Sequence, residues 1–385
     1  MATTHIFIVD SSTFKTHLEY LFAGTGASDK VIDFNNKTTT ELPYTSENAL
    51  VGMISDSQRI RKNDFIIFYL QQNTAQGIYE GKFYGIFKVV HDNSFLDNND
   101  LDQFLKTALV KSLTFRILVE PYEVYAKGVT EWEALDEIKN IQSPCQLIWS
   151  LIYRKLKGNR GNTMITIYES DRLFKLLRDK NNRTTLKSTN LSFDVSTQEI
   201  ISSNEKYTYN GRKEVINILP RLEYKLNTNK AFETHLQAYI VQNVGLGLNK
   251  SLDSCLVKKL LIEWLGNEVS CGVGMQRIDI ALSLVSKNSK IISAIELKAV
   301  EANTSNVFQI QRYVDWLEQY YIPNRISDIQ PVLVSKKIND KQSQSYANII
   351  QTFHHFNTKN FNCYPLIYIE FSLINNNLFF EEINY

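Results

Sequence analysis

Apolar and polar positions alternate over short stretches in the first half of the chain. Ile6–Val9, Phe65–Leu70 and Phe83–Val90 combine this alternation with the aromatic and β-branched residues that are typical of strands. Asp10 and the serines after it can cap a helix over Thr13–Phe22. The pattern also predicts strands at Phe115–Val119 and Met164–Ile167 and helices at Asn48–Arg59 and Gln146–Leu156. Short strands with few helices favour a small mixed β-barrel domain over residues 1–178.

Longer periodic segments follow in the second half. Ala231–Asn243 carries one apolar stripe and predicts a helix. Arg277–Leu282 and Ile291–Ala299 predict two strands joined by a polar turn at Lys287–Ser289. Further on, the pattern predicts a strand at Val332–Lys336, a helix at Ser343–His355 and a strand at Leu366–Leu373. These elements predict a second domain over residues 214–385.

Between these halves the sequence is polar. Residues from Arg178 to Lys213 show no sustained apolar periodicity and include several Lys and Arg. We therefore predict a linker over residues 179–213. Two interpretations stay open for its basic residues: a solvated connector, or a segment that lies along a phosphate backbone.

Composition narrows the function classes. The chain has 385 residues, enough for two domains, and a net charge of +1, so any nucleic-acid contact depends on local basic clusters. Its four cysteines are scattered without a C-x-x-C pair, as expected for reduced thiols in a cytoplasmic protein. The first residues, MATTHIFIVD, lack the features of a signal peptide, and no apolar run is long enough to span a bilayer. We predict a cytoplasmic protein without a membrane partner.

Candidate chemistry is concentrated in the hairpin of the second half. Pairing of its strands places Asp279 beside Glu296, and Lys298 shares a strand face with Glu296. Two carboxylates on adjacent strands can bind Mg²⁺ through oxygen ligands. The lysine can orient a water molecule and stabilise charge on a phosphoryl group. An ordinary amphipathic hairpin followed by an amphipathic helix is the alternative.

The arrangement D-(x16)-E-x-K, formed by Asp279, Glu296 and Lys298, resembles the PD-(D/E)xK nuclease superfamily. Gln309 and Tyr313 supply the Q-x-x-x-Y element that some branches carry. RIDIAL, AIELK and QIQRY together are most similar to NucS-type endonucleases. This resemblance implies a restriction-endonuclease-like α/β domain over residues 214–385, beside the α+β class of the first half. The resemblance implies catalytic roles for Asp279, Glu296, Lys298, Gln309 and Tyr313, and a metal site of Glu233, Asp279 and Glu296 that binds Mg²⁺, with Mn²⁺ as a substitute. For Glu233, a surface glutamate near a helix start is the alternative.

The first half resembles the PUA-like superfamily, in its EVE and YTH branch. The resemblance rests on FIVDSS, ALVGMISDSQRIRKND, FIIFYL and FYGIFKVV in that order, with GNRGNTMIT as a closing basic loop. It implies a pocket for a nucleobase. The candidate pocket residues are Ser11, Asn48, Tyr84, Trp132 and Arg160, with Trp149 as a second stacking surface. Tyr84 and Trp149 are equally explained as core residues.

The two resemblances together imply a two-domain DNA endonuclease of the restriction or modification-dependent kind. Its partner is double-stranded DNA, with or without a modified base. Since cutting both strands needs two active sites, a homodimer is the economical assembly. Two other functions stay open: a mismatch- or structure-specific repair endonuclease of the NucS type, and a nucleic-acid-binding protein that does not cleave.

Overall fold

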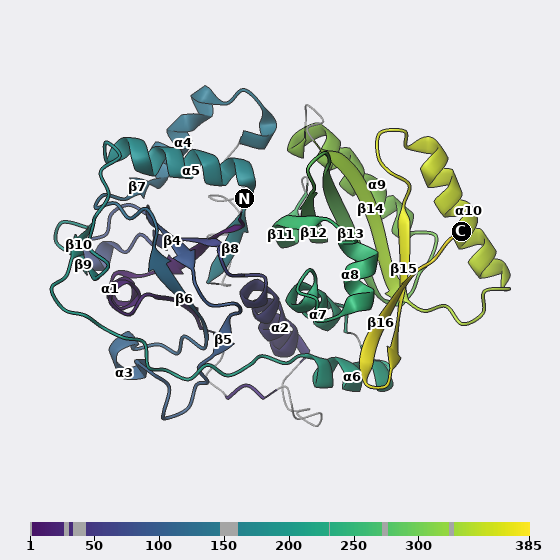
Figure 1. Ribbon diagram of the computed structural model, residues 1–385, viewed down its shortest axis with the longest axis horizontal. Helices are drawn as coiled ribbons and strands as arrows, with labels where there is room; N and C mark the ends of the chain where they lie inside the picture. The colour runs from purple at the N-terminus through teal and green to yellow at the C-terminus, as the bar shows by residue number, and fades with distance from the viewer. Residues whose placement is uncertain are drawn as a thin grey trace. The chain divides into compact units, whose positions relative to one another are not determined.

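The computed structural model describes residues 2–26, 31–33, 44–146, 161–230, 232–271, 276–322 and 327–385. The chain folds into two compact units (Figure 1). We call Ala2–Asp33 with Asp56–Ile216 the N-terminal unit. The C-terminal unit comprises, among the described residues, 44–55 and 217–385. The expected fold class, a mixed β domain joined to an α/β domain, is confirmed.

A mixed sheet of eight strands forms the centre of the N-terminal unit. Its main path runs β2-β6-β4-β3-β1-β8, with β5 paired to β6 and β7 paired to β4. β1 and β3 are parallel, and the other pairs are antiparallel. The elements are β1 (Thr4–Val9), α1 (Ser11–Tyr20), β2 (Phe22–Thr25), β3 (Phe65–Leu70), β4 (Lys82–Val89), β5 (Phe95–Leu96), α3 (Lys106–Leu109), β6 (Phe115–Pro121), β7 (Val129–Thr130), α4 (Glu131–Asp136), β8 (Asn162–Ile165) and α5 (Ile167–Lys180), with short 3-10 turns at Thr74–Gln76, Glu137–Asn140 and Pro144–Gln146.

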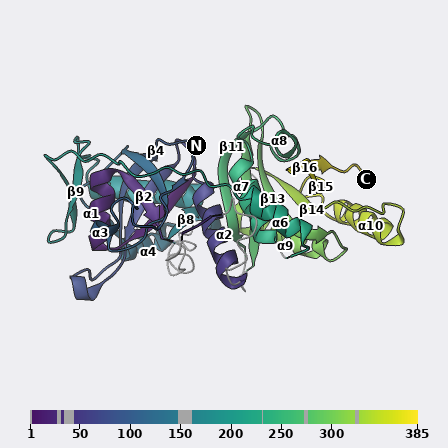
Figure 2. The ribbon, with the colours of Figure 1, turned by 90° about the horizontal axis from the view of Figure 1, so that it is seen from below.

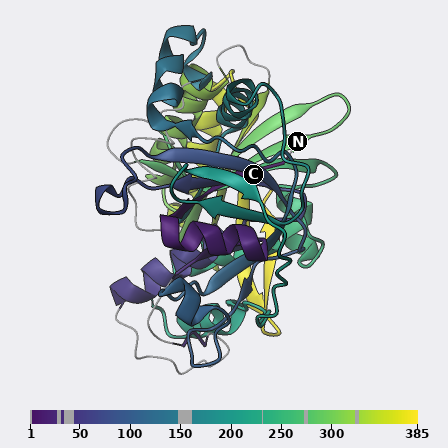
Figure 3. The same ribbon diagram turned by 90° about the vertical axis from the view of Figure 1, so that its left-hand side faces the viewer.

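Apolar side chains cover both faces of this sheet. On one face α1 packs through Phe14 and Leu18, and Figure 3 views the unit from this side. On the other face α5 packs through Leu173 and Leu177. Asp10 caps α1 by accepting a hydrogen bond from the backbone N–H of Thr13, as the sequence predicts. The sheet is therefore sandwiched between two amphipathic helices.

The stretch expected to be a linker belongs to the N-terminal unit. Residues 179–213 include an antiparallel hairpin of β9 (Leu191–Asp194) and β10 (Glu199–Ser202). Leu191, Phe193 and Ile200 are buried in the same core as α1, and the ring of Phe193 lies 4.7 Å from that of Phe14. Alternating apolar residues among many polar ones are enough to make a half-buried hairpin.

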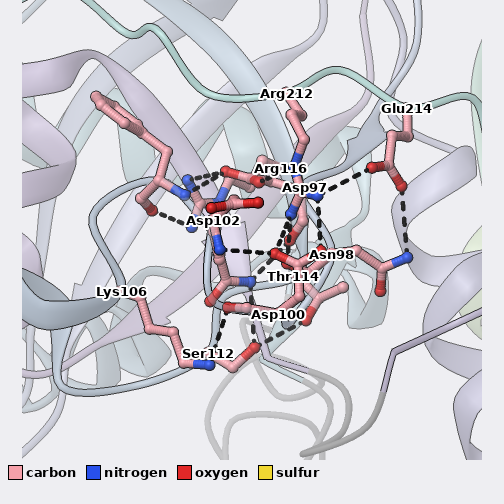
Figure 4. Close-up of polar contacts among 12 residues, drawn as sticks. Asp97, Asn98, Asp100, Asp102, Lys106, Ser112, Thr114, Arg116, Arg212 and Glu214 are labelled. Atoms are coloured by element: carbon pink, nitrogen blue, oxygen red, sulfur yellow. Dashed lines mark hydrogen bonds and ion pairs between the residues drawn. The ribbon is translucent and has the colours of Figure 1, made fainter.

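A buried polar network fixes the end of this stretch (Figure 4). Asp97 is fully buried and accepts hydrogen bonds from Arg212 Nε at 3.3 Å and from the backbone N–H of Phe104 at 3.1 Å. The Arg116 guanidinium, also buried, forms an ion pair with Asp97 at 2.9 Å. Arg212 reaches Asp100 as well, at 2.7 Å. These charge-assisted contacts tie the residues around 212 to the loop after β5.

The C-terminal unit is built on a six-stranded sheet of order β11-β12-β13-β14-β15-β16. β11, β12 and β13 are antiparallel neighbours, β13, β14 and β15 are parallel, and β16 is antiparallel to β15. The elements are α6 (Leu219–Asn227), α7 (Glu233–Asn243), α8 (Lys250–Leu256), β11 (Leu261–Ser270), β12 (Arg277–Val285), β13 (Lys290–Glu301), α9 (Asn306–Trp316) with a π-helical turn at Leu317–Tyr321, β14 (Asp328–Lys336), α10 (Gln344–Lys359), β15 (Ile367–Ile374) and β16 (Asn377–Glu382).

Helices lie on both faces of this sheet, with α7 and α8 on one and α9 and α10 on the other (Figures 1 and 2). Aromatic contacts agree with this arrangement. The ring of Phe232, next to α7, packs against that of Phe371, whereas the ring of Phe353 on α10 packs against that of Tyr368. Tyr368 and Phe371 are an odd number of residues apart on β15 and so point to opposite faces. The parallel strands follow crossover helices, as in other α/β folds.

The boundary between the two units falls within one helix. Helix α2 (Tyr44–Gln58) lies in the C-terminal unit up to Ser55. Its Glu47 is buried and accepts hydrogen bonds from Arg221 at 2.7 and 2.9 Å, from Lys225 at 3.0 Å and from His235 at 2.8 Å. We call these four residues the Glu47 cluster. Its members come from α2, α6 and α7, so it links three helices within the C-terminal unit.

None of the helices formed by the described residues combines the length and the apolar character needed to cross a membrane.

Candidate active site

The hairpin of β12 and β13 places two carboxylates side by side. Ile280 pairs with Ile295 in antiparallel register, and Asp279 and Glu296 are the next residues on each strand. Asp279 Oδ2 accepts a hydrogen bond of 2.8 Å from the backbone N–H of Leu297. The polar turn closes where the sequence predicts it, with the backbone N–H of Ser286 donating to the carbonyl of Ser289. Local alternation thus determines which residues meet at this site.

Glu296 is the most enclosed group of the site. Its side chain has no solvent exposure. Oε1 contacts the ammonium group of Lys298, in an ion pair that is also a charge-assisted hydrogen bond. Burial alone would lower the pKa of Lys298, but the charge of Glu296 outweighs it and raises that pKa. Lys298 therefore stays protonated beside the carboxylate.

Asp279 lies in a different electrostatic setting. Burial and the nearby charge of Glu296 raise the pKa of Asp279 well above its usual value, although the Leu297 N–H works against this. Two carboxylates and one ammonium group share this small buried region, which leaves one excess negative charge when both carboxylates are ionised. A further cation would remove that excess.

Tyr313 and Gln309, one turn apart on α9, support Glu296. The Tyr313 hydroxyl oxygen lies 2.6 Å from Glu296 Oε2 and 2.7 Å from the carbonyl oxygen of Arg277, and its single proton serves one of them at a time. Gln309 Nε2 donates to this hydroxyl at 2.8 Å. Burial, followed by the charges of Glu296 and Asp279, raises the pKa of Tyr313, so the hydroxyl remains a donor.

Glu233, at the start of α7, lies at the margin of the site. Its carboxylate is half-exposed and is 3.8 Å from Lys298 Nζ. Partial burial raises the pKa of Glu233, although the charge of Lys298 works against this. One turn later, Gln237 Nε2 donates to the backbone carbonyl of Asp279 at 2.9 Å. Sequence reasoning missed Gln237, although its i, i+4 spacing from Glu233 was a usable signal.

The carboxylates of Asp279 and Glu296 are chemically suited to bind a divalent cation. Glu296 Oε1 meets only a positive charge, and Asp279 uses one oxygen for a backbone N–H. Mg²⁺ is commonly held by one or two carboxylates together with water and phosphate oxygens. Among the described residues there is no cluster of three or more His, Cys, Asp or Glu side chains that could together bind a metal ion. Glu233 as a third ligand therefore stays a prediction.

In the N-terminal unit, two of the predicted pocket residues are engaged by other parts of the protein. Tyr84 is fully buried in the core with Phe14 and Phe193, and its hydroxyl donates to the carbonyl of Gln198 at 2.8 Å. Ser11 is buried and donates to Gln76 Oε1 at 2.7 Å. Tyr84 is therefore a core residue, as the alternative interpretation of the sequence has it. A base-binding role for Tyr84 or Ser11 stays a prediction.

The other pocket candidates differ in their settings. Trp132 is on α4 with 62% of its surface exposed. Asn48 is half-buried on the part of α2 that belongs to the C-terminal unit. Arg160 and Trp149 lie outside the described residues. Among the described candidates, only Trp132 offers a free aromatic face for a base.

Comparisons with known proteins add little. No protein-family model matches the chain, and no curated protein sequence is similar to it. The structure of human THYN1 protein in complex with DNA containing 5-methylcytosine aligns with a TM-score of 0.26 and 10% sequence identity, over 46% of this chain and 97% of that chain. A TM-score this low does not establish a shared fold.

Proposed function

We propose that this protein is a Mg²⁺-dependent endodeoxyribonuclease whose active site lies on the β12–β13 hairpin. The observation that carries the proposal is the position of Asp279 and Glu296 directly after the last pair of the β12–β13 ladder, beside the protonated Lys298. A half-buried aspartate with a raised pKa, a buried glutamate and a neighbouring lysine suit phosphodiester hydrolysis. A carboxylate as buried as Glu296 is costly unless it is paired, and Lys298 is the charged partner that the site supplies.

Asp279 and Glu296 would hold the metal ion, with Glu233 as an outer acidic group. When bound, Mg²⁺ polarises the phosphodiester and favours ionisation of a water molecule. Lys298 would orient that water and stabilise negative charge on the phosphoryl oxygens. Tyr313 and Gln309 would keep Glu296 in place through the hydrogen bonds described above.

DNA recognition is assigned to the N-terminal unit on the sequence resemblance alone. We propose that this unit binds double-stranded DNA through a base, modified or unmodified, with Trp132 as the stacking surface that is free to reach it. A homodimer would supply the two active sites that a double-strand cut needs.

The direct test is incubation of unmodified, methylated and hydroxymethylated plasmid with the full-length protein and Mg²⁺, followed by mapping of the cut ends. We expect cleavage that depends on the metal and stops when a chelator is added. Differences among the three plasmids would identify the base that is read. If no plasmid is cut with Mg²⁺ or Mn²⁺, the nuclease proposal fails.

Lys298→Ala should reduce the cleavage rate more than Gln309→Ala does. The ammonium group acts on charge that develops in the transition state, where losing one such group costs about 100- to 1,000-fold. Gln309 acts through Tyr313 and Glu296, where losses are about 10- to 100-fold. Single-turnover rates at saturating protein measure the difference. A Lys298→Ala variant that cuts at the parental rate would reduce Lys298 to a counter-ion of Glu296.

A further inference from the structure

Helix α9 carries an exposed stripe that the proposed active site does not use. Phe308 and Arg312 are one turn apart, so they lie on one face of the helix. Phe308 exposes 70% of its surface, which is unusual for a phenylalanine within a helix. Arg312 is exposed too, and no ion pair of Arg312 is found among the described residues. The stripe therefore presents a bare ring and an available guanidinium group.

This stripe borders the active site. Gln309 and Tyr313, the next residues along α9, are turned toward Glu296. Successive residues of a helix are about 100° apart around its axis, so the stripe flanks the side of α9 that faces the carboxylates.

The exposed surface continues toward Lys298. Val300, two residues after Lys298 on β13, is 61% exposed. The register of β13 with β14 shifts between Lys298 and Glu301, so strand alternation does not assign the face of Val300. The short connection from β13 leads directly into α9. An exposed aliphatic side chain therefore precedes the apolar ring and the guanidinium group of α9 along the chain.

We propose that the Phe308–Arg312 stripe holds the DNA strand that the site cleaves, with Arg312 on a phosphate and the Phe308 ring stacked on an unstacked base of that strand. The inference rests on the proposed nuclease function and adds a positioning surface to it. Charge complementarity favours this occupant, because a polyanion with aromatic bases matches an arginine one turn from a bare ring. A protein partner with an apolar patch would leave Arg312 unused.

The test measures binding of a short fluorescein-labelled DNA duplex to the full-length protein by anisotropy, with a chelator present so that no cleavage occurs. Phe308→Ala should weaken binding about 5- to 100-fold, the usual loss of one base–aromatic stack. Phe308→Trp should bind within about threefold of the parent, whereas Phe308→Leu should bind as weakly as Phe308→Ala, because leucine lacks a π face. Arg312→Ala should lower the slope of log affinity against log salt by about one.

Matched controls come from another part of the same unit. Phe361 is 91% exposed in the loop after α10, and Lys359 is exposed at the end of α10. Phe361→Ala and Lys359→Ala should bind DNA as the parent does. Parental affinity for Phe308→Ala, or full rescue by Phe308→Leu, would overturn the proposal. A parent that binds DNA but never cuts it would instead defeat the nuclease assignment and leave the stripe testable.

Discussion

Replacing Asp279 or Glu296 by alanine is expected to abolish DNA cleavage while leaving DNA binding intact. Each substitution removes one of the two carboxylates that face each other across the hairpin. The remaining carboxylate cannot hold a divalent ion firmly beside a phosphate. We expect cleavage to fall by about 1,000-fold or more, the upper end of the cost of losing one charge-stabilising group. Rates of plasmid nicking over a series of Mg²⁺ concentrations measure the loss.

Glu301→Ala is the matched control for these variants. Glu301 ends the same strand and is exposed, so its removal takes away a carboxylate without touching the buried pair. Its cleavage rate should stay within about twofold of the parent, as expected for an exposed side chain. DNA binding without metal should match the parent in all three variants, since phosphate contacts come mainly from basic groups and backbone N–H groups. Parental cleavage by both Asp279→Ala and Glu296→Ala would place the active site elsewhere.

Among the substitutions considered, Glu47→Ala should lower the free energy of unfolding the most. It would leave Arg221 and Lys225, each about 95% buried, without their counter-charge. Breaking a buried ion pair from one side costs about 3–5 kcal/mol. Urea denaturation followed by the fluorescence of Trp264 and Trp316, both in the C-terminal unit, reports the change in the free energy of unfolding.

Asn48→Ala provides the comparison on the same helix, because Asn48 neighbours Glu47 but does not belong to the cluster. Its free energy of unfolding should change by no more than about 0.5 kcal/mol. The free energy of unfolding of Glu47→Ala should also fall less between neutral and acidic pH than that of the parent. Burial acts to raise the pKa of Glu47, but the hydrogen bonds from its neighbours outweigh burial and lower that pKa. The stabilisation by Glu47 is therefore present above the pKa of an unfolded glutamate and is lost as pH falls through the folded pKa. Equal midpoints for Glu47→Ala and Asn48→Ala would show that the cluster contributes nothing.

The β12–β13 hairpin was predictable because its information is local. Alternation along β12 and β13 determines which side chains share a face, and one polar turn determines the register. Asp279, Glu296 and Lys298 are therefore brought together as the spacing predicts. The helix that carries Gln309 and Tyr313 begins at Asn306 and puts both residues on one face. Exposure of Phe308 was not predictable, because a phenylalanine in a helix is usually buried.

The division of the chain into two units could not be predicted from the pattern of apolar and polar residues. The Glu47 cluster joins residues 174 positions apart, and a glutamate in a helix carries no sign of such a partner. The β9–β10 hairpin did leave a signal in Leu191, Phe193 and Ile200, but the surrounding polar residues favoured a linker. The boundaries at 178 and 213 consequently differ from the structural division, which assigns residues up to 216 to the N-terminal unit and 44–55 to the C-terminal unit.

The position of Glu47 in the chain has a consequence for the order of synthesis. On a ribosome Glu47 emerges 174 residues before Arg221, its partner, and the whole remainder of the N-terminal unit is made in between. At about 5–20 residues per second, this gap lasts roughly ten to thirty seconds. During that time the first part of α2 must wait without the surface that will bury it. The C-terminal unit can complete its core only with a helix made long before its own strands, so the first part of α2 has to stay available until α6 and α7 have emerged.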